Sequence, residues 1–503
     1  MLKNTELRPV LLSFINNREY QNAIDLLIKE EVTTGTKIFN WFCESYKNSK
    51  QHSRWIEFFT KILSIEWSDD KKSQFKYFIQ EIHEYAKNEA HELIIPLIND
   101  QKQQHIILSS LTAHHADTNS SIKLLTEVES RSEQLKLYKL FIQYGIEKYN
   151  GVLLQKLKEL KSFDFNECAK ELNLTEKNIK KLEKLLSLSN EKAVFINEKM
   201  RAFVNGYGNI KGDDILLTFA QVRSRKIYDY DPVFIDLDNN EFENFLNILS
   251  SAEKPIRKHF ICANYHFLSG IVEISNDGKA KIWFVDALGT ERKNEKETVE
   301  DIEVKEPIKI FAKVFPKHEI YISREVRQRT PKTCGVFALD DTAHSFTVPL
   351  SDQKTTIIWD YLSAASKKDT AKKIYLENGE NSSVTVMSCE TPLGLTRTMQ
   401  TRSLKSKLIP NRSETEQQLI INKKGETTMG STLKFFPSTS AGEEKNTRMD
   451  YKFNNMAEKN WEFLLNNSPD KIQQSMQFFT VNEFKNRMDS NNTVKNFSQL
   501  QFS

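Results

Sequence analysis

The chain contains a set of side chains that fits the chemistry of a cysteine nucleophile. Such a cysteine must lose its proton at neutral pH, which a neighbouring histidine achieves when a carboxylate orients that histidine. Cys334 stands at the start of a predicted helix, whose N-terminal end lowers a thiol pKa further. His266 lies on a predicted strand, and Asp286 ends the next strand. The sequence therefore predicts a triad of Cys334, His266 and Asp286.

Two further residues bear on this site. Gln328 precedes Cys334 by six residues, and its amide is predicted to donate to a developing oxyanion alongside the backbone N–H of Cys334. His259 is the alternative base, and we favour His266 because His259 stands at the start of its strand, where a surface position is expected. The other cysteines lack such partners and are interpreted as packing residues: Cys43, Cys168, Cys262 and Cys389.

A predicted mixed sheet positions these residues. Strands within 259–274 and 281–289 are joined by a turn at Asp277–Gly278, a pair typical of hairpins. Because adjacent hairpin strands lie side by side, His266 and Asp286 are expected to meet. Two more elements complete this region, a strand over 318–323 and a helix that begins at Cys334.

The chain divides into three predicted regions, and the fold class is α+β. Residues 1–205 carry apolar side chains at three- and four-residue spacing, which predicts an all-α N-terminal region. Residues 206–350 form the predicted catalytic domain, and 351–503 a mostly helical C-terminal accessory region. Within that last region, helices are predicted over 355–368, 454–467 and 481–488, and a small β element near 433–436.

The composition limits the class of protein. The chain has 503 residues, with 71 Lys and Arg against 68 Asp and Glu, and a formal net charge of +3. This balance argues against a nucleic-acid-binding protein. The mean hydropathy is −0.54, and no apolar stretch approaches the roughly 18 residues of a membrane span. The five cysteines include no Cys-x-x-Cys pair, so neither a disulfide framework nor a metal site is expected.

The order His, Asp, Gln, Cys in HFLSGIV, WFVDALG and QRTPKTCGVFAL resembles the CE clan of cysteine proteases. This clan includes the ubiquitin-like (SUMO) proteases and the YopJ-type effector acetyltransferases. The resemblance implies a papain-like mixed sheet. Phe267 stands where ubiquitin-like proteases usually have Trp, and Ala287 where they usually have Ser. YopJ-type enzymes often have Glu followed by Pro-Ala at the acid, so the segment DALG favours the protease branch.

The resemblance therefore implies a cysteine protease of deubiquitinase type. It would remove ubiquitin or a ubiquitin-like modifier from host protein conjugates, without a cofactor. The first alternative is a YopJ-type Ser/Thr/Lys acetyltransferase using acetyl-CoA and inositol hexakisphosphate. The second is a non-catalytic helical interaction protein. A basic stretch with no acid between its ends favours the acetyltransferase if it binds a polyphosphate: Arg397, Arg402, Lys405, Lys407 and Arg412.

The Lys- and Asn-rich chain with its large helical flanks also resembles effectors of intracellular bacteria such as Legionella. This resemblance implies a soluble virulence protein that a specialised secretion system delivers into the host cytosol. The N-terminal segment lacks the basic start, apolar run and small-residue cleavage site of a signal peptide, which fits such a route.

Overall fold

The chain divides into two compact units, Met1–Glu198 and Lys199–Ser503. The structure is a computed structural model. It describes residues 4–29, 45, 54–55, 57–58, 61, 131–147, 149–160, 172–204, 210–227, 229–263, 266–289, 304–328, 333–347, 358–366, 371–375, 383–396, 399, 414–418, 420, 425, 427 and 448–490.

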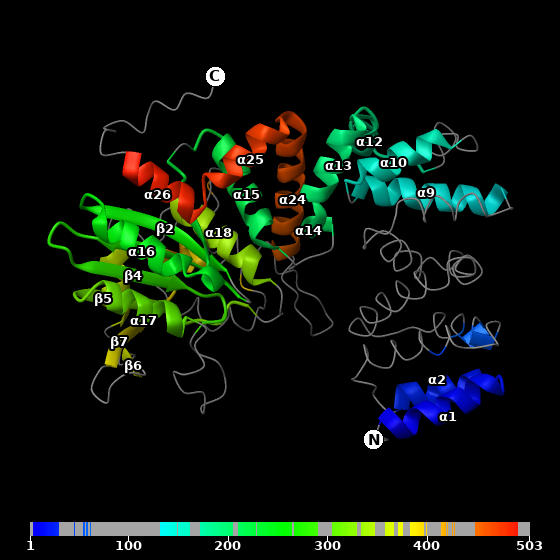
Figure 1. Ribbon diagram of the computed structural model, residues 1–503, viewed down its shortest axis with the longest axis horizontal. Helices are drawn as coiled ribbons and strands as arrows, with labels where there is room; N and C mark the ends of the chain where they lie inside the picture. The colour runs from blue at the N-terminus through cyan, green and yellow to red at the C-terminus, as the bar shows by residue number, and fades with distance from the viewer. Residues whose placement is uncertain are drawn as a thin grey trace. The chain divides into compact units, whose positions relative to one another are not determined.

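The described elements of the first unit are all helices, as predicted (blue to cyan in Figure 1). Two of these helices begin after a residue whose side chain caps the helix N-terminus. Asn150 and Thr175 accept hydrogen bonds at the N-termini of α10 and α12, from the backbone N–H groups of Leu153 and Asn178. The helices are α1 (Asn4–Asn16), α2 (Tyr20–Lys29), α9 (Arg131–Glu147), α10 (Gly151–Glu159), α12 (Glu176–Leu186) and α13 (Asn190–Lys199).

The second unit contains helices and strands, which confirms the α+β fold class. Its elements are α14 (Arg201–Val204), α15 (Gly212–Ser224), β1 (Val233–Asp236), η1 (Leu237–Asn239), α16 (Glu241–Ser251), β2 (Ile256–Ala263), β3 (Phe267–Ile274), β4 (Ala280–Val285), α17 (Lys305–Val314), β5 (His318–Ser323), α18 (Cys334–Thr347), α19 (Ile358–Ser366), β6 (Ala371–Tyr375), β7 (Ser383–Cys389), α20 (Leu393–Thr396), α22 (Glu414–Gln417), α24 (Arg448–Asn466), α25 (Pro469–Gln477) and α26 (Val481–Ser490).

The described strands form one mixed sheet in the order β1-β2-β3-β4-β5-β7-β6. The pairs β2–β3, β3–β4 and β6–β7 are antiparallel, and the other three pairs are parallel. The predicted turn between β3 and β4 is present: Gly278 has a φ of 76° and its N–H donates to the Ser275 carbonyl at 2.9 Å. The predicted strand over 318–323 has the same bounds as β5.

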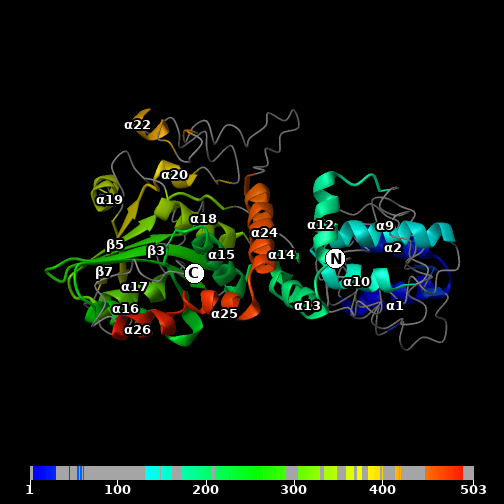
Figure 2. The same cartoon turned by 90° about the horizontal axis from the view of Figure 1, so that it is seen from above.

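Helices cover both faces of the sheet, because side chains alternate along each strand. Helices α16, α17 and α26 lie on one face, and α18, α19 and α20 on the other (Figure 2). The first face buries the larger apolar cluster, which contains Phe260, Phe284 and Ile320. The second face buries a smaller one around Trp283 and Tyr321.

The predicted strand interval 259–274 is wrong in one respect, because it holds two strands. Ala263 of β2 pairs with Phe267 of β3 in an antiparallel pair, so the chain reverses direction between these two residues. His266 therefore lies in the turn immediately before β3 and not on a strand. The reversal was missed because the sequence between Ala263 and Phe267 contains no Gly or Pro, and Asn264 alone is a weak turn signal.

The residues after 350 contribute to the same unit as the sheet. Strands β7 and β6, which the sequence did not predict, extend the sheet beyond β5. The N–H of Phe234 in β1 donates to the Phe479 carbonyl at 2.8 Å, and the rings of Phe245 and Phe484 lie 5.9 Å apart. The predicted helices near 355–368, 454–467 and 481–488 are present as α19, α24 and α26. The β element near 433–436 lies outside the described residues, and the boundaries at 205 and 350 stay predictions.

Candidate active site

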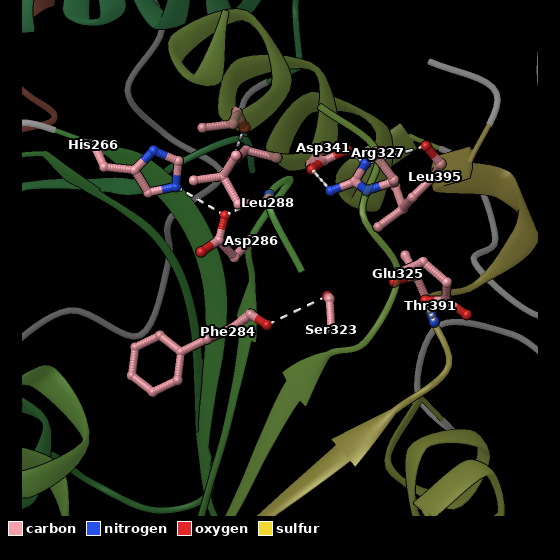
Figure 3. Close-up of polar contacts among 12 residues, drawn as sticks. His266, Phe284, Asp286, Leu288, Ser323, Glu325, Arg327, Asp341, Thr391 and Leu395 are labelled. Carbon is pink, nitrogen blue, oxygen red and sulfur yellow. Dashed lines mark hydrogen bonds and ion pairs between the residues drawn. The ribbon is translucent and has the colours of Figure 1, made fainter. Parts of the chain in front are cut away.

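His266 and Asp286 meet at one end of the β3–β4 hairpin, as the sequence predicted. Nε2 of His266 lies 2.8 Å from Oδ1 of Asp286 (Figure 3). The Leu288 N–H donates to the same oxygen at 2.8 Å. Both side chains are largely buried, at 12% and 4% exposed. Because a carboxylate accepts, the ring proton of His266 sits on Nε2, which leaves Nδ1 as the basic nitrogen.

Cys334 lies next to His266 at the first residue of α18. Burial raises the pKa of its thiol. The side-chain hydrogen bond with His266, the N–H groups of Phe267 and Gly335 and the charge of His266 lower the thiol pKa by more, so it falls below its ordinary value. This electrostatic arrangement favours a thiolate at the start of a helix.

The residue after the cysteine is a glycine for a steric reason. A Cβ at Gly335 would lie 3.2 Å from Cβ of Ile210, which is 4% exposed. The first turn of α18 therefore approaches the segment before α15 closely. The Thr333 carbonyl accepts from the N–H groups of Val336 and Phe337 and so begins the helix. These contacts fix the backbone that carries Cys334.

Gln328 is buried on the side of the site that holds Asp286. Its backbone N–H donates to the Ala287 carbonyl at 2.8 Å, and the residue is 4% exposed. The structure thus brings Gln328 to the loop that follows the carboxylate. Its predicted action on an oxyanion beside the Cys334 N–H stays a prediction.

The competing histidine and the other described cysteines lie in different surroundings. His259 pairs with Ile271 in the middle of the sheet, and burial together with the charges of Arg257 and Lys258 lowers its pKa to about 3. Cys262 and Cys389 are fully buried, and burial raises the pKa of both thiols. These groups are poorly suited to act as a base or a nucleophile at neutral pH. Cys43 and Cys168 lie outside the described residues.

Two groups of charged residues near the sheet were missed by the sequence analysis. One is the buried pair of Arg327 and Asp341, which lies beside the triad (Figure 3). The other, which we call the Phe478 cluster, consists of Arg223 and Arg487, which lie over the Phe478 ring, and Lys258, whose pKa both arginines lower. No local sequence pattern pairs these residues, and the fold brings them together.

The remaining sequence predictions concern metals, membranes and the basic stretch. No group of three potential metal ligands occurs among the described residues. Within the same residues, no helix has the length and apolar character needed to cross a bilayer. The basic stretch of Arg397, Arg402, Lys405, Lys407 and Arg412 lies outside the described part of the chain.

Comparison with family models finds no match, and no curated protein matches the chain. Several solved structures align with just over half of it. AvrA delL154 with IP6 and CoA aligns at a TM-score of 0.35 and 11% identity, over 55% of this chain and 98% of that one. HopZ1a with IP6 aligns at 0.38 and 8%, over 56% and 95%. HopZ1a with IP6 and CoA aligns at 0.34 and 9%, over 55% and 98%.

These matches correct the predicted function. AvrA and HopZ1a are YopJ-family effectors, and IP6 and CoA are the ligands of the alternative prediction. The prediction of a thiol protease or deubiquitinase that acts on ubiquitin conjugates is therefore wrong. The cause lies in the motif: the segments around His266 and Cys334 fit both branches of the clan, and the choice depended on DALG alone.

Proposed function

We propose that the protein is an acyltransferase in which Cys334 carries an acetyl group from acetyl-CoA to a Ser, Thr or Lys side chain of a host protein. The observation that carries this proposal is the contiguous arrangement of Cys334, His266 and Asp286 with a lowered thiol pKa. Its donor and acceptor follow the resemblance of the motif to YopJ-type acetyltransferases. In the same way we infer that the protein is a bacterial effector acting in host cells.

The first half of the reaction forms a thioester on the enzyme. The Cys334 thiolate attacks the thioester carbonyl of acetyl-CoA, a C–S bond forms, and a tetrahedral oxyanion develops. We expect the Cys334 N–H and the Gln328 amide to donate to this oxyanion. The C–S bond to coenzyme A then breaks, and its sulfur leaves with the proton held by His266.

The second half regenerates the thiolate. Nδ1 of His266 takes the proton of the acceptor hydroxyl or amine, whose oxygen or nitrogen attacks the S-acetyl carbon. The bond from carbon to Cys334 sulfur breaks, and the thiolate returns to its hydrogen bond with the protonated His266. Asp286 keeps the ring oriented through Nε2 in both halves, at the 2.8 Å contact.

The Phe478 cluster has the chemistry expected of a site for inositol hexakisphosphate, the ligand that AvrA and HopZ1a hold as IP6. The guanidinium carbons of Arg223 and Arg487 lie 3.5 Å and 3.7 Å from the Phe478 ring centroid. Nη1 of Arg223 and Nη2 of Arg487 are buried and have no hydrogen-bond partner among the described residues. Free guanidinium donors are the groups that recognise phosphate oxygens.

Charge supports the same assignment. Asp231 forms an ion pair with Lys258, and Glu483 is the other acid that acts on Arg487. Burial lowers the pKa of Arg487 to about 10, and repulsion from Arg223 adds to this effect. A bound polyphosphate would supply the negative charge that stabilises these cations. Arg223, Lys258 and Arg487 are the residues that would hold it.

The test of the reaction is acetyl transfer from labelled acetyl-CoA by the full chain. Wild type is expected to acquire one acetyl group, which peptide mass spectrometry places on Cys334, and to pass it to a Ser, Thr or Lys of an acceptor protein. Cys334→Ala is expected to lose transfer at least about 10³-fold. A wild-type chain that binds acetyl-CoA but is never acetylated at Cys334 would refute the proposal.

The test of the polyphosphate site is thermal unfolding with inositol hexakisphosphate. The ligand is expected to raise the unfolding temperature of wild type and to have little effect on Arg223→Gln/Arg487→Gln. Lys313→Gln is the matched control, because Lys313 is an exposed cation on α17 that pairs with Glu243. Equal stabilisation of the double variant and wild type would show that inositol hexakisphosphate does not bind at the Phe478 cluster.

A further inference from the structure

Arg327 is a buried cation that contacts the helix carrying Cys334. The residue is 0% exposed. Its Nη1 donates to Oδ1 of Asp341 at 2.8 Å, and its Nη2 to Oδ2 at 2.5 Å, which makes a bidentate pair (Figure 3). Nη1 also donates to the Leu395 carbonyl at 3.2 Å. The side chain therefore joins α18 to the segment that contains α20.

The backbone of Arg327 is hydrogen-bonded to the residue that follows Asp286, the carboxylate of the triad. The N–H groups of Arg327 and Gln328 donate to the Ala287 carbonyl at 2.7 and 2.8 Å. Ala287 follows Asp286 directly in the chain. Arg327 thus contacts the loop of the carboxylate through its backbone and the helix of the nucleophile through its side chain.

The electrostatic surroundings keep this guanidinium charged. Burial lowers the pKa of Arg327, but the carboxylates of Asp341, Glu325 and Asp286 outweigh this effect and raise it. Glu325 is itself held in place, because the Thr391 N–H donates to it at 2.6 Å. The guanidinium of this pair therefore stays charged at neutral pH.

The place of Asp341 on α18 makes the contact sensitive to helix rotation. Asp341 follows Cys334 by seven residues, which is about two helical turns, so both lie on the same side of α18. Phe337 lies between them, and the Arg327 guanidinium carbon is 5.4 Å from its ring centroid. Contacts on two successive turns fix the rotation of α18 about its axis. That rotation decides where the sulfur of Cys334 points.

We propose that Arg327 is a positioning residue that, acting through Asp341, turns α18 so that Cys334 faces His266. A buried ion pair contributes little net stability compared with apolar side chains of similar volume. Orientation of the nucleophile helix is a better account of this pair than stability. The proposal uses the triad of the proposed function and does not depend on the acyl donor.

The test measures alkylation of Cys334 by iodoacetamide against pH, read on the peptide that contains Cys334. The double variant Arg327→Met/Asp341→Leu removes the pair without leaving a single buried charge. Its alkylation rate at pH 7 is expected to fall about tenfold or more, since the thiolate fraction falls about tenfold for each unit that the thiol pKa rises. Arg327→Lys keeps the charge but lacks the planar fork, so a smaller fall is expected.

The neighbouring ion pair on the same helix supplies the matched control. Asp340 follows Cys334 by six residues, which places it on a different side of α18, and it pairs with Lys452 of α24. Asp340→Leu/Lys452→Met is expected to keep the wild-type alkylation profile. A wild-type profile in either Arg327 variant, or an equal shift in the control, would overturn the proposal. Because iodoacetamide needs no acyl donor, this result is independent of whether acetyl transfer is observed.

Discussion

The two faces of the sheet bury different kinds of side chain. The face under α16, α17 and α26 buries an apolar cluster in which aromatic rings meet at 5.8–6.4 Å, among them Phe242, Phe245, Phe260 and Phe284. The face under α18 also buries polar groups, including Ser269, Ser323, Arg327 and Asp341. Apolar contact is not directional, whereas each buried polar group requires a partner in a set direction. We therefore expect the apolar face to contribute most of the folding free energy and the α18 face to fix the positions of the site residues.

Magnitudes support this division. Burying one large apolar side chain contributes about 1.5–3 kcal/mol, and the apolar face holds most of those side chains in the sheet. A buried ion pair is close to neutral against an apolar substitute. Variants on the apolar face should therefore change the free energy of unfolding, and variants on the α18 face should change the reactivity of Cys334.

The largest effect is expected from Asp286→Asn on the α18 face. A neutral amide stabilises the protonated His266 less and no longer fixes the proton on Nε2, so acyl transfer is expected to fall about 10²–10⁴-fold. The measurement is acetyl transfer together with the pH profile of Cys334 alkylation, whose midpoint should rise. The urea midpoint of unfolding should stay near that of wild type. A variant that unfolds but keeps its reactivity when folded would contradict the division between faces.

Phe260→Ala is the corresponding change on the apolar face. Phe260 is 0% exposed, and its ring lies 5.9 Å from that of Phe242 and 5.8 Å from that of Phe245. Its loss should lower the free energy of unfolding by about 3–5 kcal/mol, measured by urea denaturation. The folded fraction should keep the wild-type alkylation profile of Cys334. A shifted profile would show that the two faces are coupled.

On the α18 face, the sequence predicted the features that depend on residues close together in the chain. The start of α18 at Cys334 and the bounds of β5 agree with the structure. The meeting of His266 and Asp286 also agrees, because the β3–β4 hairpin brings the residue before β3 beside the residue after β4. Their catalytic roles, and that of Gln328, stay predictions.

The sequence did not predict contacts that depend on distant segments. Arg327 meets Leu395, and Arg223 shares an aromatic ring with Arg487, only because the chain returns to the sheet after residue 350. Strand β7 was missed although Val384 and Val386 alternate with polar residues, since the segment before it is polar and carries no strand signal. Electrostatic partners have no periodicity, and so no sequence pattern reveals them.

Asp214→Asn changes a buried polar group beside α18 that we expect to affect stability and its dependence on pH. Asp214 of α15 is 5% exposed. Burial raises its pKa to about 7 from 3.8, and the charge of Asp213 adds to this. The folded state therefore holds a proton that the unfolded state releases, and stability is lost as pH rises from about 4 to about 7. The loss is at most roughly 4 kcal/mol.

We expect Asp214→Asn to be more stable than wild type at pH 8 and similar to it at pH 4, in urea denaturation at both values. The amide oxygen can still accept from the Lys211 N–H, which lies 2.9 Å from Oδ2 in the native helix. Asp213→Asn is the control, since the Asp213 side chain is 76% exposed. A wild-type pH slope in Asp214→Asn would show that this carboxylate titrates normally.

The smallest effects are expected from substitutions of two glycines, one packed against the apolar face of the sheet and one near the site on the α18 face. A Cβ at Gly270 in β3 would lie 2.3 Å from the Phe260 ring and 2.7 Å from the Trp283 carbonyl oxygen. A Cβ at Gly289, whose φ is 62°, would lie 2.4 Å from the backbone of Glu325. Gly289 follows Asp286 by three residues, and Glu325 precedes Arg327 by two.

Gly270→Ala should therefore lower the free energy of unfolding by about 1–3 kcal/mol through overpacking, with alkylation of Cys334 unchanged. Gly289→Ala should cost a similar free energy, because a left-handed φ and a backbone clash both oppose it. It should also shift the alkylation profile, since it displaces the segment that joins Asp286 to Arg327. Urea denaturation and alkylation of the same two variants separate these outcomes. Equal alkylation profiles of the two variants would mean that the segment containing Glu325 can shift without moving the triad residues.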